Sequence, residues 1–164
     1  MIKISVCDDD EGQLTFFKQC FMEYNEKHKE KIEANFYQSV QSLLNEKKFS
    51  PDVYFLDIEL QDGNGLKLAG KIRTRNSKIP IVFITSHEEF MPEAFHVHAY
   101  QYLNEKKNAQ AVENVLNQLA DYFSEQNQIF SFQTYGEMIS LDCRDIICFT
   151  SEKRKNLSLI HISE

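Results

Sequence analysis

Three carboxylates in a row, Asp8, Asp9 and Asp10, directly follow the hydrophobic run IKISVC. A fourth, Asp57, ends the apolar run VYFL, and Thr85 ends the run IVFI. Neighbouring anions repel one another, so acids that converge at the ends of buried segments need a cation between them. Oxygen-only ligands favour a hard cation such as Mg²⁺. The alternative is that the three acids lie in a solvated loop and that Asp57 caps a turn.

These acids stand in a regular alternation of strands and helices. The patterns predict strands over 2–7, 31–37, 51–60, 79–85 and 99–103, and helices over 14–28, 39–48, 66–75, 88–95 and 109–123. The run in 51–60 is almost continuously apolar, as in a strand buried on both faces of a parallel sheet. Five alternations predict an open, doubly wound α/β sheet. Ligands of such sheets bind beyond the carboxyl ends of the strands, where the acids stand.

Composition limits the class of protein. The chain has 164 residues, 42% of them hydrophobic and 26% charged, which predicts one well-packed soluble domain with a fragment of a second. No apolar run approaches the roughly 18 residues of a membrane helix, so we expect no membrane partner. The net charge of −7 argues against nucleic-acid binding by the chain as a whole. Its four cysteines form no CxxC pair, which favours a reducing, cytoplasmic location.

The acids and their neighbours resemble the receiver domain of two-component response regulators. The likeness covers residues 1 to 126 and implies a flavodoxin-like (βα)5 fold. Five motifs carry it, in the family's order and at its separations: CDDD at Asp8 and Asp9, FLDIEL at Asp57, the turn at Asn64 and Gly65, FITSH at Thr85, and AYQYL at Tyr102.

The resemblance implies a regulatory protein rather than an enzyme. Asp57 would accept a phosphoryl group from a sensor histidine kinase, and phosphorylation would drive homodimer formation. Thr85 and Tyr102 would be the switch residues that carry the change to the output surface. The implied Mg²⁺ would be held by Asp8, Asp9, Asp57 and the backbone carbonyl of Glu59.

The chain departs from the family after the switch aromatic. Receivers have a lysine three residues later, and that lysine pairs with the phosphate, but this chain has Glu105 there, followed by Lys106. Either Lys106 takes over the pairing or phosphorylation is weakened. A haloacid-dehalogenase-type enzyme also uses an aspartate at a strand end. That class would need a second aspartate at the position of Glu59.

The pattern changes after residue 126. The stretch IFSFQTYGEMISLDCRDIICFTSEKRKN has β composition and resembles the beginning of a LytTR-type DNA-binding domain. We therefore expect a receiver over 1–126 and an output fragment over 127–164, with DNA bound only through a complete effector domain. The basic residues Lys153, Arg154 and Lys155 are either phosphate contacts or a basic loop. Residues 157–164, LSLIHISE, resemble translated cloning sequence, and we expect them to be non-native.

Two functions follow from these features. One is a phosphorylation-controlled transcription regulator with an incomplete DNA-binding part, which the LytTR-like stretch favours. The other is a stand-alone receiver or pseudo-receiver that acts by protein–protein contact, which Glu105 favours.

Overall fold

The computed structural model of the chain divides into two compact units, Met1–Leu116 and Asn117–Glu164. Its described residues are 1–85, 90–103, 108–126, 129–134, 137–142, 146–152 and 156–161. Side chains are described through residue 125, apart from 91 and 95.

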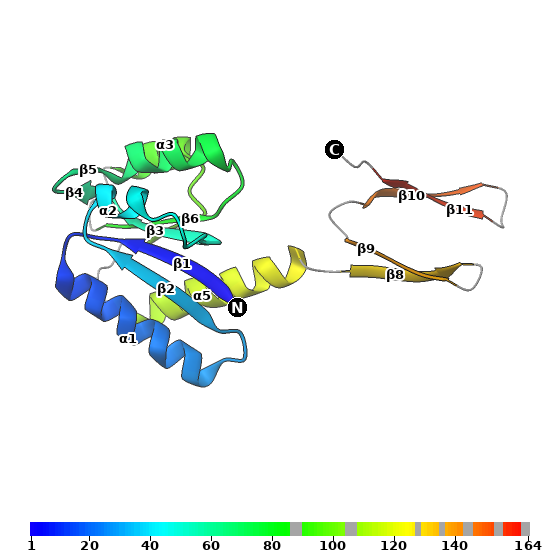
Figure 1. Ribbon diagram of the computed structural model, residues 1–164, viewed down its shortest axis with the longest axis horizontal. Helices are drawn as coiled ribbons and strands as arrows, with labels where there is room; N and C mark the ends of the chain where they lie inside the picture. Colours follow the sequence, from blue (N-terminus) through cyan, green and yellow to red (C-terminus); the bar gives the residue numbers. More distant parts are fainter. Residues whose placement is uncertain are drawn as a thin grey trace. The chain divides into compact units, whose positions relative to one another are not determined.

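The first unit contains a five-stranded parallel sheet, in the order β2-β1-β3-β6-β7. Its strands are β1 Ile2–Cys7, β2 Ile32–Tyr37, β3 Val53–Asp57, β6 Ile81–Ile84 and β7 Gln101–Leu103. The helices are α1 Glu11–Lys27, α2 Val40–Asn45, α3 Gly65–Arg75, α4 Met91–His96 and α5 Ala109–Gln126. Figure 1 shows α1 and the first part of α5 on one face of the sheet, and α2 and α3 on the other. The predicted doubly wound flavodoxin-like fold is thus confirmed.

Aromatic side chains join α1 to the sheet. Phe17 and Phe21 of α1 contact Phe55 of β3 edge to face, with ring centroids 5.9 and 5.8 Å apart. All three rings are buried, and burial of each contributes about 1.5–3 kcal/mol to folding. A second cluster, with Leu56, Leu68 and Phe83, fills the α3 face. The central strand β3 is therefore packed from both sides, and its end at Asp57 is held firmly.

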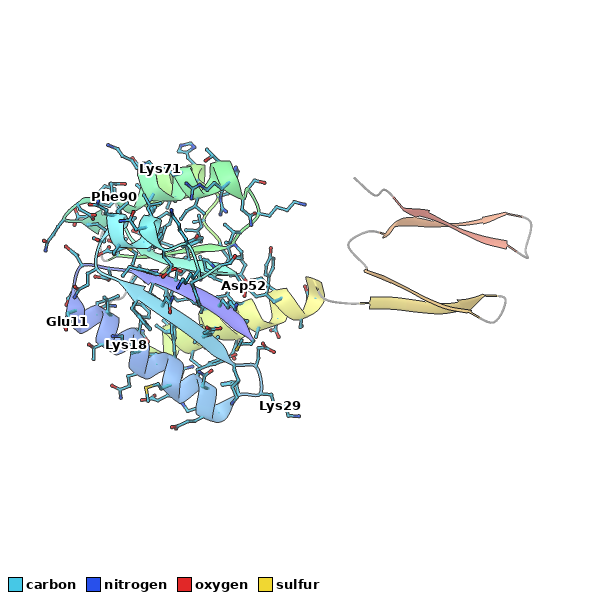
Figure 2. All side chains as sticks on the ribbon, viewed as in Figure 1. Glu11, Lys18, Lys29, Asp52, Lys71 and Phe90 are labelled. Carbon is cyan, nitrogen blue, oxygen red and sulfur yellow. The ribbon has the colours of Figure 1, made fainter. Side chains whose placement is uncertain are left out.

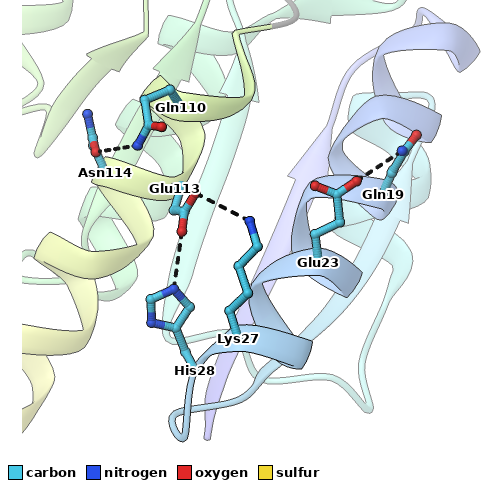
Figure 3. Close-up of polar contacts among 7 residues, drawn as sticks. All are labelled: Gln19, Glu23, Lys27, His28, Gln110, Glu113 and Asn114. Carbon is cyan, nitrogen blue, oxygen red and sulfur yellow. Dashed lines mark hydrogen bonds and ion pairs between the residues drawn. The ribbon is translucent and has the colours of Figure 1, made fainter.

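Polar contacts join α1 to the beginning of α5 (Figure 3). The Glu113 carboxylate lies 3.3 Å from Nε2 of His28 and 3.8 Å from Nζ of Lys27. The His28 ring stacks on Tyr24 with the centroids 4.0 Å apart. These contacts fix the first turns of α5 against the end of α1.

Several predicted boundaries differ from the structure by a few residues, and two of them bear on the site. Helix α1 begins at Glu11, three residues earlier than predicted, because Asp10 caps it. The predicted strand 51–60 ends at Asp57, and the next residues form a small hairpin of β4 Glu59–Leu60 and β5 Gly63–Asn64. The apolar pattern runs on through Ile58 and Leu60, both buried, and so hides the break.

The second unit has β structure, as the composition predicts. Strands β8 Ile129–Thr134 and β9 Glu137–Asp142 pair antiparallel, and so do β10 Ile146–Glu152 and β11 Asn156–His161. Strand β11 is an element that the sequence did not predict. Across the described part of the chain, no helix is long and apolar enough to cross a membrane.

Candidate functional site

Three carboxylates meet at the carboxyl end of the sheet. Asp8 and Asp9 follow β1, and Asp57 ends the neighbouring β3, because Cys7 pairs with Leu56 in the parallel register. One carboxylate oxygen from each of the three lies within 4.8 Å of the others. Asp8 is 0% exposed and Asp57 2%, so water screens their repulsion poorly. The strand ends therefore bring together the acids that the sequence singles out.

Backbone amides orient two of these acids. The amide of Ile58 donates a 2.7 Å hydrogen bond to Oδ1 of Asp57. The amide of Asp10 donates a 2.9 Å bond to Oδ1 of Asp8. Charge-assisted bonds of this kind are stronger and more directional than neutral ones. Both acids thus have an ordered oxygen that the main chain holds in place.

Asp10 has a different role from the acids before it. Its Oδ1 accepts hydrogen bonds from the amides of Gly12, at 2.7 Å, and Gln13, at 3.3 Å, so it is the N-cap of α1. Sequence reasoning left this residue without a role. The preference for Asp immediately before a helix would have identified it.

The negative charge of the site affects the pKa of the neighbouring Cys7 thiol. Burial, and after it the carboxylates of Asp62 and Asp8, raise the pKa of Cys7 to about 12. Asp57 and Asp9 act in the same direction. A buried group surrounded by this much negative charge stays neutral. The same potential attracts a cation to the strand ends.

The donor set fits Mg²⁺. Asp8, Asp9 and Asp57 offer carboxylate oxygens only, which a small, hard divalent ion prefers. Glu59 stands two residues after Asp57 in β4, and its side chain is exposed. A divalent charge would offset the repulsion between the two buried acids.

Thr85 and Tyr102 lie on neighbouring strands. Thr85 follows β6 and is fully buried, and its amide donates a 3.1 Å bond to the carbonyl of Leu103. Tyr102 of β7 pairs with Phe83 of β6, and its half-buried ring packs on the core cluster. The two residues therefore belong to one continuous part of the sheet.

Five residues named in the sequence analysis lie outside the described residues: Glu105, Lys106, Lys153, Arg154 and Lys155.

An open hollow of about 410 Å³ adjoins the acids. It is lined by Asp9, Glu59, Leu60, Gln61, Gly63, Asn64 and Phe90. Figure 2 shows Phe90 and Glu11 at one end of the sheet and Asp52 and Lys29 at the other. The hollow gives one side of the acid cluster access to solvent and to reactants.

Relatives share parts of this chain. It is 29% identical over 120 residues to an uncharacterised response regulatory protein of Yersinia pestis, covering 73% of this chain and 49% of that one. It is 32% identical over 111 residues to the sensory transduction protein LytR of Staphylococcus haemolyticus, covering 68% and 42%. The chain thus spans less than half the length of these curated relatives.

Solved structures share the fold. A CheY-like receiver domain protein from Methanospirillum hungatei aligns with a TM-score of 0.66 at 18% identity, covering 77% of this chain and 99% of that one. The response regulator TrrA of Thermotoga maritima, in complex with Mg²⁺ and BeF, aligns with a TM-score of 0.62 at 22% identity, covering 73% and 99%. The family model of the response regulator receiver domain matches residues 4–117. The chain therefore belongs to the response regulator receiver domain family of two-component systems.

Proposed function

We propose that the chain accepts a phosphoryl group from a sensor histidine kinase on Asp57. The metal site would consist of Asp8, Asp9, Asp57 and the backbone carbonyl of Glu59. The observation that carries this proposal is the convergence of the three carboxylates within 4.8 Å at the end of the sheet. Membership of the receiver family supports it.

The chemistry is a nucleophilic substitution at phosphorus. The Asp57 oxygen that does not accept from Ile58 attacks the phosphoryl group, and an acyl phosphate bond forms as the bond to the donor histidine nitrogen breaks. The electron pair of that bond stays on the histidine. Bound Mg²⁺ supplies positive charge that offsets the charge on the transferred oxygens. The hydrogen bond from Ile58 keeps the nucleophile oriented.

Thr85 and Tyr102 would convert the phosphoryl group into a surface change. The Thr85 hydroxyl would donate to a phosphoryl oxygen and draw the end of β6 inward. Tyr102 lies one strand away and is half-buried, so a small shift changes how much of its ring is exposed. A local charge event would thereby alter the output surface.

The output would be transcriptional, through a LytTR-type domain of which residues 127–164 are the beginning. Relatives named as transcriptional regulatory protein LytR, from Staphylococcus aureus, are 31% identical over 68 residues. The receiver would then extend over 1–126 and form a homodimer on phosphorylation. Lys153, Arg154 and Lys155 would contact DNA phosphates only in a complete effector domain.

A second candidate is a pseudo-receiver that acts by protein–protein contact without phosphorylation. The observation that favours it is Glu105 where the family has lysine, since an acid beside the phosphate opposes its charge. In the first candidate Lys106 supplies the missing cation.

The test is exposure to a small-molecule phosphodonor with Mg²⁺, followed by intact mass measurement. We expect one added phosphoryl group that requires Mg²⁺ and is absent from Asp57→Asn, whose side chain is nearly isosteric. Asp52→Asn is the matched control, because Asp52 lies at the other end of the sheet, where it accepts from the amide of Lys3 (Figure 2). A mass shift that survives in Asp57→Asn would contradict the assignment. No mass shift in any variant would favour the pseudo-receiver.

A further inference from the structure

Asp62 connects the hairpin after Asp57 to helix α2. It lies in the two-residue turn between β4 and β5, where Leu60 pairs with Gly63. Its Oδ1 accepts a 2.9 Å hydrogen bond from the amide of Val40, and its Oδ2 accepts a 3.0 Å bond from the amide of Gln41. These are the first two amides of α2, which have no partners within the helix. A side chain from the hairpin therefore caps a helix more than twenty residues earlier in the chain.

The hairpin also packs closely on α2. A Cβ atom at Gly63 would lie 2.9 Å from Cγ2 of Val40, which is closer than side-chain carbons approach one another. A side chain at Gly63 would therefore have to displace the Val40 side chain. The two hydrogen bonds of Asp62 and this contact fix the turn from two directions.

The other end of the hairpin is bonded to Ile58 and packs against the backbone of Asp57. The amide of Gly65 donates a 2.8 Å bond to the carbonyl of Ile58. A Cβ atom at Gly65 would lie 2.0 Å from the carbonyl oxygen of Asp57. Asn64 then caps α3 by accepting from the amides of Leu66 and Lys67. The hairpin therefore begins and ends beside Asp57, and its turn is held by α2.

Glu59 lies in this hairpin. It belongs to a strand of two residues and pairs with Asn64. Two ladder positions fix such a short strand weakly, because isolated two-stranded hairpins are only marginally stable. The position of the Glu59 carbonyl thus depends on what holds the turn.

We propose that Asp62 is a positioning residue of the metal site. By binding the amides of Val40 and Gln41, it holds the hairpin so that the Glu59 carbonyl faces the carboxylates of Asp8 and Asp57. The inference rests on the proposed function, since it assigns to Asp62 the support of the proposed metal ligand Glu59. It adds α2 to the elements on which metal affinity depends.

A rival explanation is that Asp62 acts through its charge. Its carboxylate is the first of the acids that raise the pKa of Cys7, so its field reaches the strand ends. The two explanations separate in Asp62→Asn. That change removes the charge and keeps one accepting oxygen, so it retains one of the two hydrogen bonds to the helix, while its amino group can only donate.

The experiment measures Mg²⁺ binding to the full chain by calorimetry, for wild type, Asp62→Ala, Asp62→Asn and Ser39→Ala. Ser39 is the matched control, because its Oγ caps the same helix through Ser42, at 3.1 Å, from outside the hairpin. Amide hydrogen exchange of residues 58–65, without metal, is the second readout.

We expect Asp62→Ala to bind Mg²⁺ about tenfold more weakly, as for other outer-shell supports of a metal ligand. Its hairpin amides should exchange faster. Asp62→Asn should lose clearly less than Asp62→Ala in both respects, since it keeps one of the two hydrogen bonds to α2. Ser39→Ala should change neither quantity.

Four outcomes would overturn the inference. The first two are an unchanged Mg²⁺ dissociation constant and unchanged amide exchange of the hairpin in Asp62→Ala. The third is a loss of Mg²⁺ affinity in Asp62→Asn equal to that in Asp62→Ala, which would indicate that Asp62 acts through its charge. The fourth is an equal loss of affinity in Ser39→Ala, which would indicate fraying of α2. Failure of wild type to bind Mg²⁺ would instead overturn the proposed metal site, and the inference with it.

Discussion

At the scale of single residues, Gly65 approaches the backbone of Asp57 so closely that no side chain fits between them. A Cβ atom there would lie 2.0 Å from the Asp57 carbonyl oxygen and 3.0 Å from the Cα of Ile58. Both neighbours are backbone atoms of a buried strand end, so neither can move without displacing Asp57.

We predict that Gly65→Ala destabilises the fold by about 2–3 kcal/mol, since overpacking a rigid site carries a cost of this size. Gly70 in the same helix is the matched control, because no atom lies within 4 Å of its Cβ position. Gly70→Ala should stabilise the fold by up to about 1 kcal/mol, as alanine is the better helix former. Urea unfolding of both variants measures the difference. Equal effects of the two changes would contradict the close approach.

The raised pKa of the Cys7 thiol makes the free energy of unfolding depend on pH. Burial and the nearby carboxylates raise its pKa from 9.0 to about 12, so between these values the unfolded chain ionises the thiol and the folded chain does not. The folded state then holds the extra proton. Its free energy of unfolding therefore falls as pH rises above 9, by at most about 1.4 kcal/mol per pH unit for this group.

We predict that Cys7→Ala loses part of this alkaline destabilisation. The measurement is the free energy of unfolding of wild type and variant at pH 8, 9, 10 and 11, compared as a difference so that tyrosines and lysines cancel. A difference that stays constant over this range would show that the folded state ionises Cys7 as readily as the unfolded chain does.

At the scale of elements, Arg73 joins helix α3 to the segment that leads into β7. Its guanidinium donates to the carbonyl of Val97 at 2.9 Å, to that of His98 at 2.8 Å, and to that of Ile79. His98 has a φ of 52°, a left-handed conformation that is uncommon for a residue with a side chain. The arginine thus holds an unfavourable backbone conformation just before the strand of Tyr102.

We predict that Arg73→Ala destabilises the fold by about 2 kcal/mol, because hydrogen bonds from a charged donor are worth more than neutral ones. Arg73→Lys should restore little, since an ammonium cannot reach three carbonyls with the planar geometry of a guanidinium. The exposed Arg75, also in α3, is the matched control, and Arg75→Ala should stay within about 0.5 kcal/mol. Thermal unfolding of the three variants measures these changes in stability. If Arg73→Lys were as stable as wild type, the hydrogen bonds to the three carbonyls would not be what stabilises the fold.

The sequence predicted the type of each helix and strand where the apolar pattern was long. It did not predict the residues at which these elements begin and end. The strands at Ile2–Cys7 and Ile81–Ile84 follow directly from their apolar runs. The hairpin after Asp57 escaped prediction because Ile58 and Leu60 continue the buried pattern across the break. Its geometry depends on contacts with Val40, far away in sequence, and a local pattern carries no such information.

The candidate site, too, was predictable only in part. Strand ends of a parallel sheet meet at one edge, so the pattern alone brings Asp8 and Asp57 together. Asp62 was missed because its function is to accept hydrogen bonds from Val40 and Gln41, which only the folded chain brings within reach.

At the scale of the whole molecule, the chain combines a receiver domain with a short β segment. The family match ends at residue 117, close to the end of the first compact unit at Leu116. Among its described residues, the second unit contains the last part of α5 and two antiparallel pairs, β8 with β9 and β10 with β11. Two-stranded pairs bury little apolar area, so such a unit has little stability of its own.

This composition leads to a prediction about DNA. The chain carries a net charge of −7, and outside the basic KRK cluster at residues 153–155 its sequence has more acidic than basic residues. Any affinity for DNA should therefore come from phosphate contacts alone, without discrimination between sequences, and should fall steeply as salt rises. We expect binding to be negligible at physiological salt. Titration of two unrelated duplexes at low and at physiological salt measures this, with Lys153→Glu as the variant that should remove the residual affinity. Tight binding to one duplex and not to the other would show that residues 127–164 already form a self-sufficient DNA-binding unit.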